Sequence, residues 1–94
     1  MKYYLFGIYD SATQIYDGPF KARSNEEAMR TFMNMAGDPN LPVAQNPEYF
    51  SLARLGVYDD NTGVLLSEET GPVHLLQARD CVNSSRPEDA GDET

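Results

Sequence analysis

Residues 2–9 form the first regular pattern in the chain, and almost all of them are aromatic or aliphatic. With a period of two, Tyr3, Leu5 and Tyr9 fall on one side of an extended segment and Phe6 and Ile8 on the other, so both sides are apolar. Aromatic and β-branched residues favour strands. We therefore expect a strand that lies centrally in a sheet, or that is covered by a helix on one side and by a partner on the other.

The next segment has the composition of a return strand with an interruption. Residues 14–16 resume the extended pattern, Asp17-Gly18-Pro19 is typical of a turn, and residues 20–22 are extended again. This order predicts a hairpin whose second strand is kinked or bulged.

Residues 24–36 have the pattern of an amphipathic helix. Ser24 and Glu27 have the spacing of a capping box, in which the hydroxyl accepts from the Glu27 amide and the carboxylate accepts from the Ser24 amide. Gly37 and Pro39 supply the stop. The apolar stripe predicted to pack on the sheet comprises Ala28, Met29, Phe32, Met33 and Ala36.

After an irregular, proline-rich connection at 39–47, the second half repeats the strand pattern. Residues 51–58 and 64–67 read as two strands joined by the turn cluster 59–63, while residues 73–78 suit either an edge strand or a helical turn. The sequence thus predicts an α+β fold in the order β-β-α-β-β, with a small antiparallel sheet of about four strands and one helix on one face. Residues 1–80 form the expected single domain, and residues 81–94 form an expected disordered acidic tail.

Charge and cysteine content narrow the class of protein. The chain has seven Lys and Arg residues and fifteen Asp and Glu residues, so its net charge is -8. This charge excludes bulk electrostatic attraction to nucleic acid or anionic lipid. A lone cysteine, Cys81, excludes an intramolecular disulfide and a cysteine-based zinc site. The chain has no secretion signal pattern and no membrane-spanning run, so we expect a soluble intracellular protein without membrane contact.

The two predicted hairpins share the pattern G-[IV]-Y-D-x-x-T-x-[IV], at residues 7–15 and 56–64. An Asp that ends a strand can accept from an amide two residues later, so the repeat indicates the same turn chemistry used twice. An alternative is one shared acidic site for a divalent cation. Its ligands would be Asp10, Asp17, Asp59 and Asp60.

Motifs for catalysis, cofactors and metals are absent from the sequence. His74 is the only histidine, and no nucleophile motif, phosphate-binding loop or zinc spacing accompanies it, so we expect no enzyme activity and no cofactor. Aromatic residues beside bases on a small sheet suggest a second possibility, direct binding of single-stranded DNA by stacking and phosphate contacts. The residues of that strip would be Lys2, Tyr16, Phe20, Lys21, Arg23 and Arg54.

Five short motifs, taken in their order along the chain, resemble those of one protein family. They are I-Y-D-S at 8–11, G-P-F at 18–20, D-P-N at 38–40, N-P-E-Y at 46–49 and L-x-x-L-G-x-Y-D-x-x-T-G at 52–63. Together they resemble the small nonstructural protein of gokushovirus-type Microviridae, which are single-stranded DNA phages. The resemblance covers about residues 3–66 and includes neither residues 73–80 nor the tail.

This resemblance implies a non-enzymatic accessory protein in the host cytoplasm. It implies a role in viral single-stranded DNA synthesis or genome packaging, through viral or host replication proteins or the procapsid. No catalytic residue is transferred by it. The acidic balance favours protein partners, and a homodimer is a further possibility because one helix covers only one face of the first strand.

Overall fold

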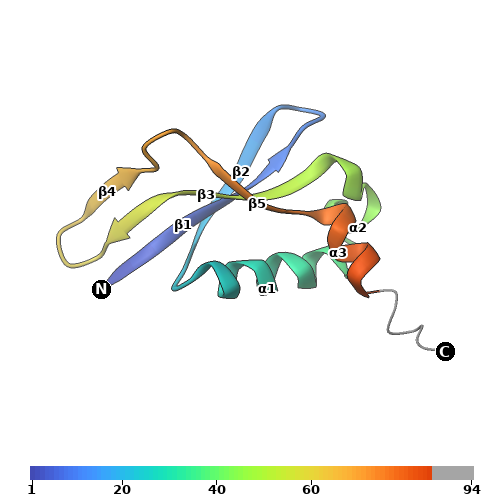
Figure 1. The fold of residues 1–94 in the computed structure, drawn as a ribbon, viewed down its shortest axis with the longest axis horizontal. Coiled ribbons are helices and arrows are strands. Elements are labelled where there is room, and N and C mark those ends of the chain that lie inside the picture. Colours follow the sequence, from blue (N-terminus) through green and yellow to red (C-terminus); the bar gives the residue numbers. More distant parts are fainter. Residues whose placement is uncertain (86–94) are drawn as a thin grey trace.

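The computed structural model describes residues 1–85, and it gives the side chains of residues 1–81 (Figure 1). Strand β1 (Lys2–Asp10) lies at the centre of an antiparallel sheet, between β2 (Ile15–Ala22) and β3 (Phe50–Asp59). The predicted central position of the first strand is therefore confirmed. It follows from a segment whose two faces are both apolar.

The far edge of β3 is shared by two short strands. Strand β4 (Val64–Ser67) pairs with residues 56–59 of β3, and β5 (Val73–Gln77) pairs with residues 51–54. Within residues 1–85 the sheet thus has five strands, and the expected order β-β-α-β-β is incomplete. Residues 73–77, whose type the sequence leaves open, are a strand because they supply backbone partners to the half of β3 that β4 does not reach.

The predicted hairpin with a kinked or bulged return strand is confirmed, but residues 17–19, which have the composition of a turn, form the bulge and do not reverse the chain. Strand β2 runs through these residues without reversing, and its pairing with β1 shifts between Phe6 and Ile8. The reversal lies earlier, at residues 11–14, and Gln14 has a φ of 62° there. A bulge accommodates the extra residues and lets the strand continue.

Helix α1 (Asn25–Ala36) begins as the capping pattern predicts, with one difference. The Glu27 amide donates to the Ser24 hydroxyl at 3.1 Å, but the Glu27 carboxylate accepts from the amide of Arg23, at 2.6 Å, instead of that of Ser24. Of the predicted stripe, Ala28, Phe32 and Ala36 are buried and Met33 is exposed. Met29 is partly buried and also packs against the core, so Met33 is the stripe residue that faces solvent.

The core is closed at one end by three short elements. Helix α2 (Pro42–Gln45) and the 3-10 helix η1 (Pro47–Tyr49) occupy the proline-rich connection, and α3 (Ala78–Ser85) follows β5. Ala78 and Cys81 are buried in the same cluster as Phe32. The boundary expected at residue 80 therefore differs from the structure, because α3 continues to Ser85 and Cys81 belongs to the core. Residues 86–94 of the expected tail lie outside the described residues.

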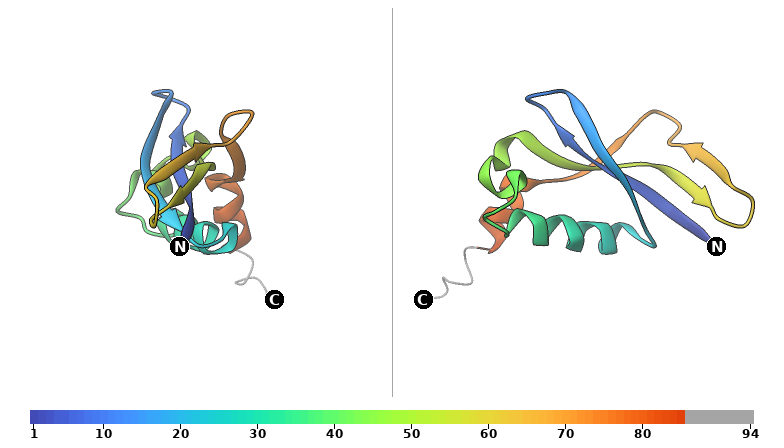
Figure 2. Two further views of the ribbon diagram at one scale, coloured as in Figure 1. Left: turned by 90° about the vertical axis from the view of Figure 1, so that its left-hand side faces the viewer. Right: turned by 180° about the vertical axis from the view of Figure 1, so that it is seen from behind.

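All helices lie on one side of the sheet, which gives the protein two layers (Figure 2). Phe6, Phe32 and Leu52 are the largest fully buried side chains between these layers. No helix among residues 1–85 is long and apolar enough to cross a membrane. The opposite side of the sheet, called the open face below, carries no helix within the part of the chain that the structure describes.

Candidate binding surfaces

The register of the strands defines which side chains share the open face. Tyr9 lies opposite Tyr16 on β2 and Ser51 on β3, and Ala53 lies opposite His74 on β5. Since side chains alternate between the two faces of a strand, the remaining members follow from the same pairs. The open-face strand positions are Tyr3, Leu5, Gly7, Tyr9, Tyr16, Lys21, Ser51, Ala53, Gly56, Tyr58, Leu65, Ser67, His74 and Gln77.

Three aromatic side chains from three different strands form a cluster on this face. The Tyr9 and Tyr16 rings are 4.5 Å apart between centroids, at an interplanar angle of 40°. The His74 ring meets Tyr9 edge-on at 5.7 Å and lies 6.0 Å from Tyr16. Tyr16 and His74 are both exposed, so the cluster presents ring surface to solvent instead of filling the core. We call Tyr9, Tyr16 and His74 the aromatic cluster.

Hydrogen bonds fix the His74 ring within this cluster. Its Nε2 atom lies 3.1 Å from the Tyr16 hydroxyl, and its Nδ1 atom lies 3.1 Å from the Ser51 hydroxyl. A neutral imidazole donates from one nitrogen and accepts at the other, and a hydroxyl can do either, so both bonds form in either tautomer. The arrangement differs from a Ser-His-Asp triad, because a tyrosine hydroxyl stands where a carboxylate would orient the ring.

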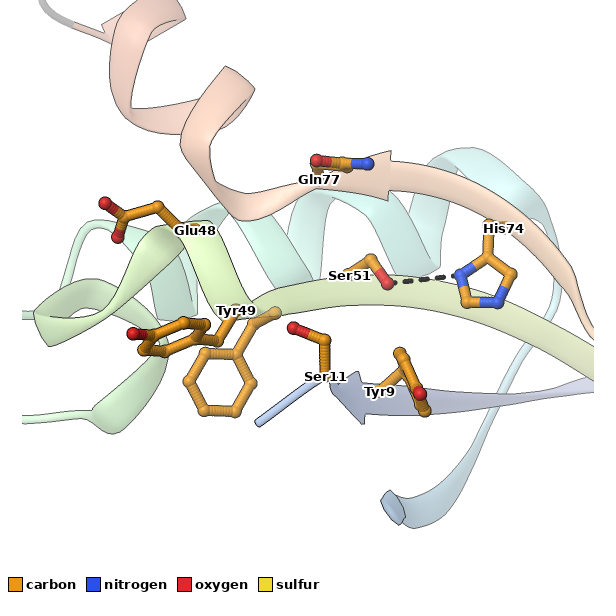
Figure 3. Close-up of a pocket in the computed structure, with 8 residues that line it drawn as sticks. Tyr9, Ser11, Glu48, Tyr49, Ser51, His74 and Gln77 are labelled. Atoms are coloured by element: carbon orange, nitrogen blue, oxygen red, sulfur yellow. Dashed lines mark hydrogen bonds between the residues drawn. The ribbon is translucent and has the colours of Figure 1, made fainter. Parts of the chain in front are cut away.

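A cleft adjoins the aromatic cluster at the end of the sheet nearest η1 (Figure 3). Its volume is about 210 Å³, and its walls combine aromatic rings with polar groups. The amide of Ser11 donates to the carbonyl of Tyr49 at 2.8 Å and ties the β1–β2 turn to η1 beside it. The lining residues are Tyr9, Ser11, Glu48, Tyr49, Phe50, Ser51, His74 and Gln77.

Charge is segregated between the two faces of the sheet. Among the strand positions of the described chain, the open face has no Asp or Glu and has one Lys, Lys21. The Lys21 ammonium group lies 4.4 Å from the centroid of the Tyr3 ring, which is a cation–π contact. Asp10 and Asp17 line a different hollow, with Ile8 and Val43, on the helix side. The strand positions of this face therefore carry no carboxylate, and Glu48, in the adjoining cleft, is the acidic residue beside them.

Five of the six residues of the expected DNA-binding strip lie in three places. Tyr16 and Lys21 are on the open face. Phe20 packs against the core, with its ring stacked on Phe6 at 5.8 Å. Lys2 and Arg23 line a hollow with Tyr4 on the other side of the sheet.

Arg54, the sixth residue, is held on the helix side by a network of its own. It forms an ion pair with Glu68 at 2.7 Å, donates to the Asn25 side chain at 3.2 Å and lies over the Tyr4 ring at 5.3 Å. The hydrogen bond that Arg54 donates to the Glu68 carboxylate, together with the charge of that carboxylate, raises the pKa of Arg54. Most of the guanidinium's bonding capacity is thus used within the fold.

Tyr3, Tyr9, Ser51 and His74 are open-face residues that were not selected from the sequence. The two-residue period placed Tyr3 and Tyr9 together, so that signal was present. His74 and Ser51 are 23 residues apart and come together only through the β3–β5 pairing, for which the sequence holds no local signal.

The shared cation site of four aspartates is excluded by the register. Asp10 ends β1, whereas Asp59 lies opposite Lys2 at its beginning, so roughly 26 Å of strand separates the two turns. Asp10 instead accepts from the Ala12 amide at 2.9 Å, and Asp59 accepts from the Asn61 amide at 3.0 Å, in each case two residues later. Within residues 1–85 no group of three or more His, Cys, Asp or Glu could hold a metal ion. The repeated motif is turn chemistry used twice.

A second surface is formed by the hairpin of β3 and β4, which extends past the first turn of α1 (Figure 1). Its apolar side chains are highly exposed: Val64 is 48%, Leu65 63% and Leu66 64% exposed. In the described chain, the outer edge of β4 pairs with no other strand. We call Val64, Leu65 and Leu66 with this edge the β4 arm.

The fold therefore defines a small two-layer α+β protein with two exposed surfaces, the open face and the β4 arm. A family described as Phage ORF5 protein matches residues 3–81, and the chain belongs to this family. The match extends beyond the motifs quoted above, to β5 and to the buried Cys81, and thus covers the elements that complete the sheet and core. No curated protein and no solved structure matches the chain.

Proposed function

We propose that this phage protein is a non-enzymatic accessory factor in viral single-stranded DNA synthesis or genome packaging. It acts in the host cytoplasm through protein partners, which are viral or host replication proteins or the procapsid. The family membership supports a phage role, and the resemblance to the Microviridae nonstructural protein supports the more specific one.

The β4 arm is the observation that carries this proposal. A soluble protein rarely leaves an unguarded apolar edge strand exposed, because such an edge pairs with other chains. Native edges are commonly protected by Lys, Pro or a bulge, and β4 has the sequence Val-Leu-Leu-Ser, with none of these. Leu65 and Leu66 project to opposite faces, so an added strand would find apolar contacts on both sides of the backbone pairing.

The test removes the apolar contacts of the arm without touching the core. Phage that lacks this gene would be complemented with the wild-type protein or with the double variant Leu65→Asp/Leu66→Asp. The measurements are the ratio of viral single-stranded to double-stranded DNA in infected cells and the yield of packaged genomes. We expect the double variant to behave like the deletion, because charged side chains at the arm prevent strand addition.

Met33→Asp is the matched control, since Met33 is also an exposed apolar residue, at 46%, but lies on α1. It is expected to complement like the wild type. Complementation by the double variant at the wild-type level would overturn the proposal. Light scattering of the purified protein tests whether a second copy of the chain binds the arm. A dimer that is present in the wild type and lost in the double variant would identify a second copy as the partner.

A further inference from the structure

We propose that the open face binds a short stretch of single-stranded DNA, with bases stacked on the aromatic cluster and a phosphate near Lys21. This inference deepens the proposed function and rests on it only for its biological setting. The aromatic cluster and Lys21 lie on β1, β2 and β5, outside the β4 arm, and the two surfaces share only Leu65, so each can fail without the other.

Ring surface is the first observation that carries the inference. Tyr16 is 39% exposed on β2, and His74 is exposed on β5, with Tyr9 between them on β1. The core on the other side of the sheet does not need these rings, since Phe6, Phe32 and Leu52 fill it. Exposed rings held at fixed angles on a sheet are the usual stacking platform for unpaired bases.

Preorganisation is the second observation. The bonds from His74 to the Tyr16 and Ser51 hydroxyls, both 3.1 Å, hold the exposed rings in one orientation across strands β2, β3 and β5. A ring that is already fixed loses little conformational entropy when a base stacks on it.

Charge complementarity is the third observation. The open-face strand positions of the described chain carry Lys21 and no carboxylate, although the net charge of the chain is -8. Lys21 lies over Tyr3, which places one cation beside another ring. A polyanion with exposed bases can approach this face while the acidic helix side repels it elsewhere.

The dimensions set the length of the ligand. From Tyr3 to Tyr9 the face is roughly 20 Å long, which matches about six stacked nucleotides at 3.4 Å each. The cleft beside the cluster can take one unstacked base, with the Ser51 hydroxyl and Gln77 amide at its rim as hydrogen-bonding groups (Figure 3).

The experiment is fluorescence anisotropy with a 5′-labelled oligothymidylate of about eight nucleotides, at low and moderate salt. We expect weak binding with a shallow salt dependence, a logarithmic slope of about -0.7, because a single lysine replaces few counterions. Tyr16→Ala is expected to weaken binding about tenfold, whereas Tyr16→Phe keeps the ring and most of the affinity. Lys21→Gln is expected to reduce the salt slope toward zero.

Matched controls lie on the opposite face. Tyr4 is 37% exposed, close to the value for Tyr16, and Lys2 is a strand lysine like Lys21. Both control residues lie on the helix side of the sheet. Tyr4→Ala and Lys2→Gln are expected to bind like the wild type. Circular dichroism of each variant checks that it is folded.

Three results would overturn the inference: no binding at low salt, equal losses in Tyr4→Ala and Tyr16→Ala, or tighter binding of the matching RNA or duplex. None of these results bears on the β4 arm. Conversely, Leu66→Asp changes only the helix-side leucine of the arm and is expected to retain DNA binding, so its failure in infected cells would be assigned to lost protein contacts.

Discussion

Tyr16 and His74 lie on different strands on either side of the β1–β3 pair, and the Tyr16 hydroxyl meets Nε2 of His74 at 3.1 Å. The bond passes over Tyr9, whose ring contacts both partners. It links strands that share no backbone pairing and thereby holds one end of the open face together.

We expect His74→Phe to lower the free energy of unfolding by about 1 to 2 kcal/mol, because the part-buried Ser51 hydroxyl loses its imidazole partner. Tyr16→Phe removes only the solvent-exposed bond and is expected to cost about 0.5 to 1 kcal/mol. Urea denaturation of both variants and of the double variant measures these values. Strictly additive losses would contradict a coupled network.

Arg54 and Glu68 form the most enclosed ion pair of the described chain, with side chains 23% and 17% exposed. Glu68→Gln leaves the guanidinium without its charged partner and is expected to cost about 1 to 3 kcal/mol. The Glu68 interaction raises the pKa of Arg54 in the folded state. Its stabilising effect is therefore fully present below the unfolded pKa, which is far above neutral, and is lost only as the pH rises through the still higher folded value.

The loss in Glu68→Gln should accordingly be the same at about pH 6 and at about pH 9, as measured by urea denaturation. Glu69→Gln is the matched control, since Glu69 is an exposed neighbour on the same loop, and it should change stability by less than about 0.5 kcal/mol. A loss in Glu68→Gln that varied strongly between these pH values would contradict this assignment.

Gly56 lies opposite Ser67 of β4, and a Cβ atom at Gly56 would overlap the carbonyl oxygen of Leu66. Both atoms of that overlap are backbone-fixed, so Gly56→Ala must displace β4. We expect a loss of about 1 to 3 kcal/mol and faster amide exchange at residues 64–67. Gly37→Ala, where the nearest atoms stand at 3.6 Å, is the control and should be close to neutral.

Cys81 is buried, at 5% exposure, and its thiol donates to the carbonyl of Gln77 at 3.6 Å. The pKa of this thiol is raised above its ordinary value of 9.0, mainly by burial and to a smaller extent by the charge of Asp80. Native protein should therefore react slowly with an aromatic disulfide reagent at about pH 8, and denatured protein much faster.

The same shift predicts a pH dependence of stability. Because folding raises the thiol pKa, the contribution of the protonated Cys81 thiol to stability is fully present below the unfolded pKa. This contribution is lost as the pH rises through the folded pKa. Stability should thus fall above about pH 9, and Cys81→Ala should fall less steeply. Equal slopes in the two proteins would contradict the assignment.

The local features of the fold can be read from short stretches of the chain. The apolar faces of residues 2–9 predicted the central strand, Ser24 and Glu27 predicted the start of α1, and the repeated G-[IV]-Y-D pattern predicted two like turns. These features depend on neighbours within a few residues, for which propensity, capping and turn chemistry are sufficient.

Tertiary structure alone decided what distant residues do together. Residues 73–77 became a strand because β3 offered an unpaired edge, and Cys81 became a core residue because α3 closes the end of that core. The expected strip of six residues was divided between two faces because a bulge in β2 and pairing across the sheet set which way each side chain points. Ser51, His74 and Tyr16 met for the same reason: strand register is a long-range property, and no local pattern in the sequence contains it.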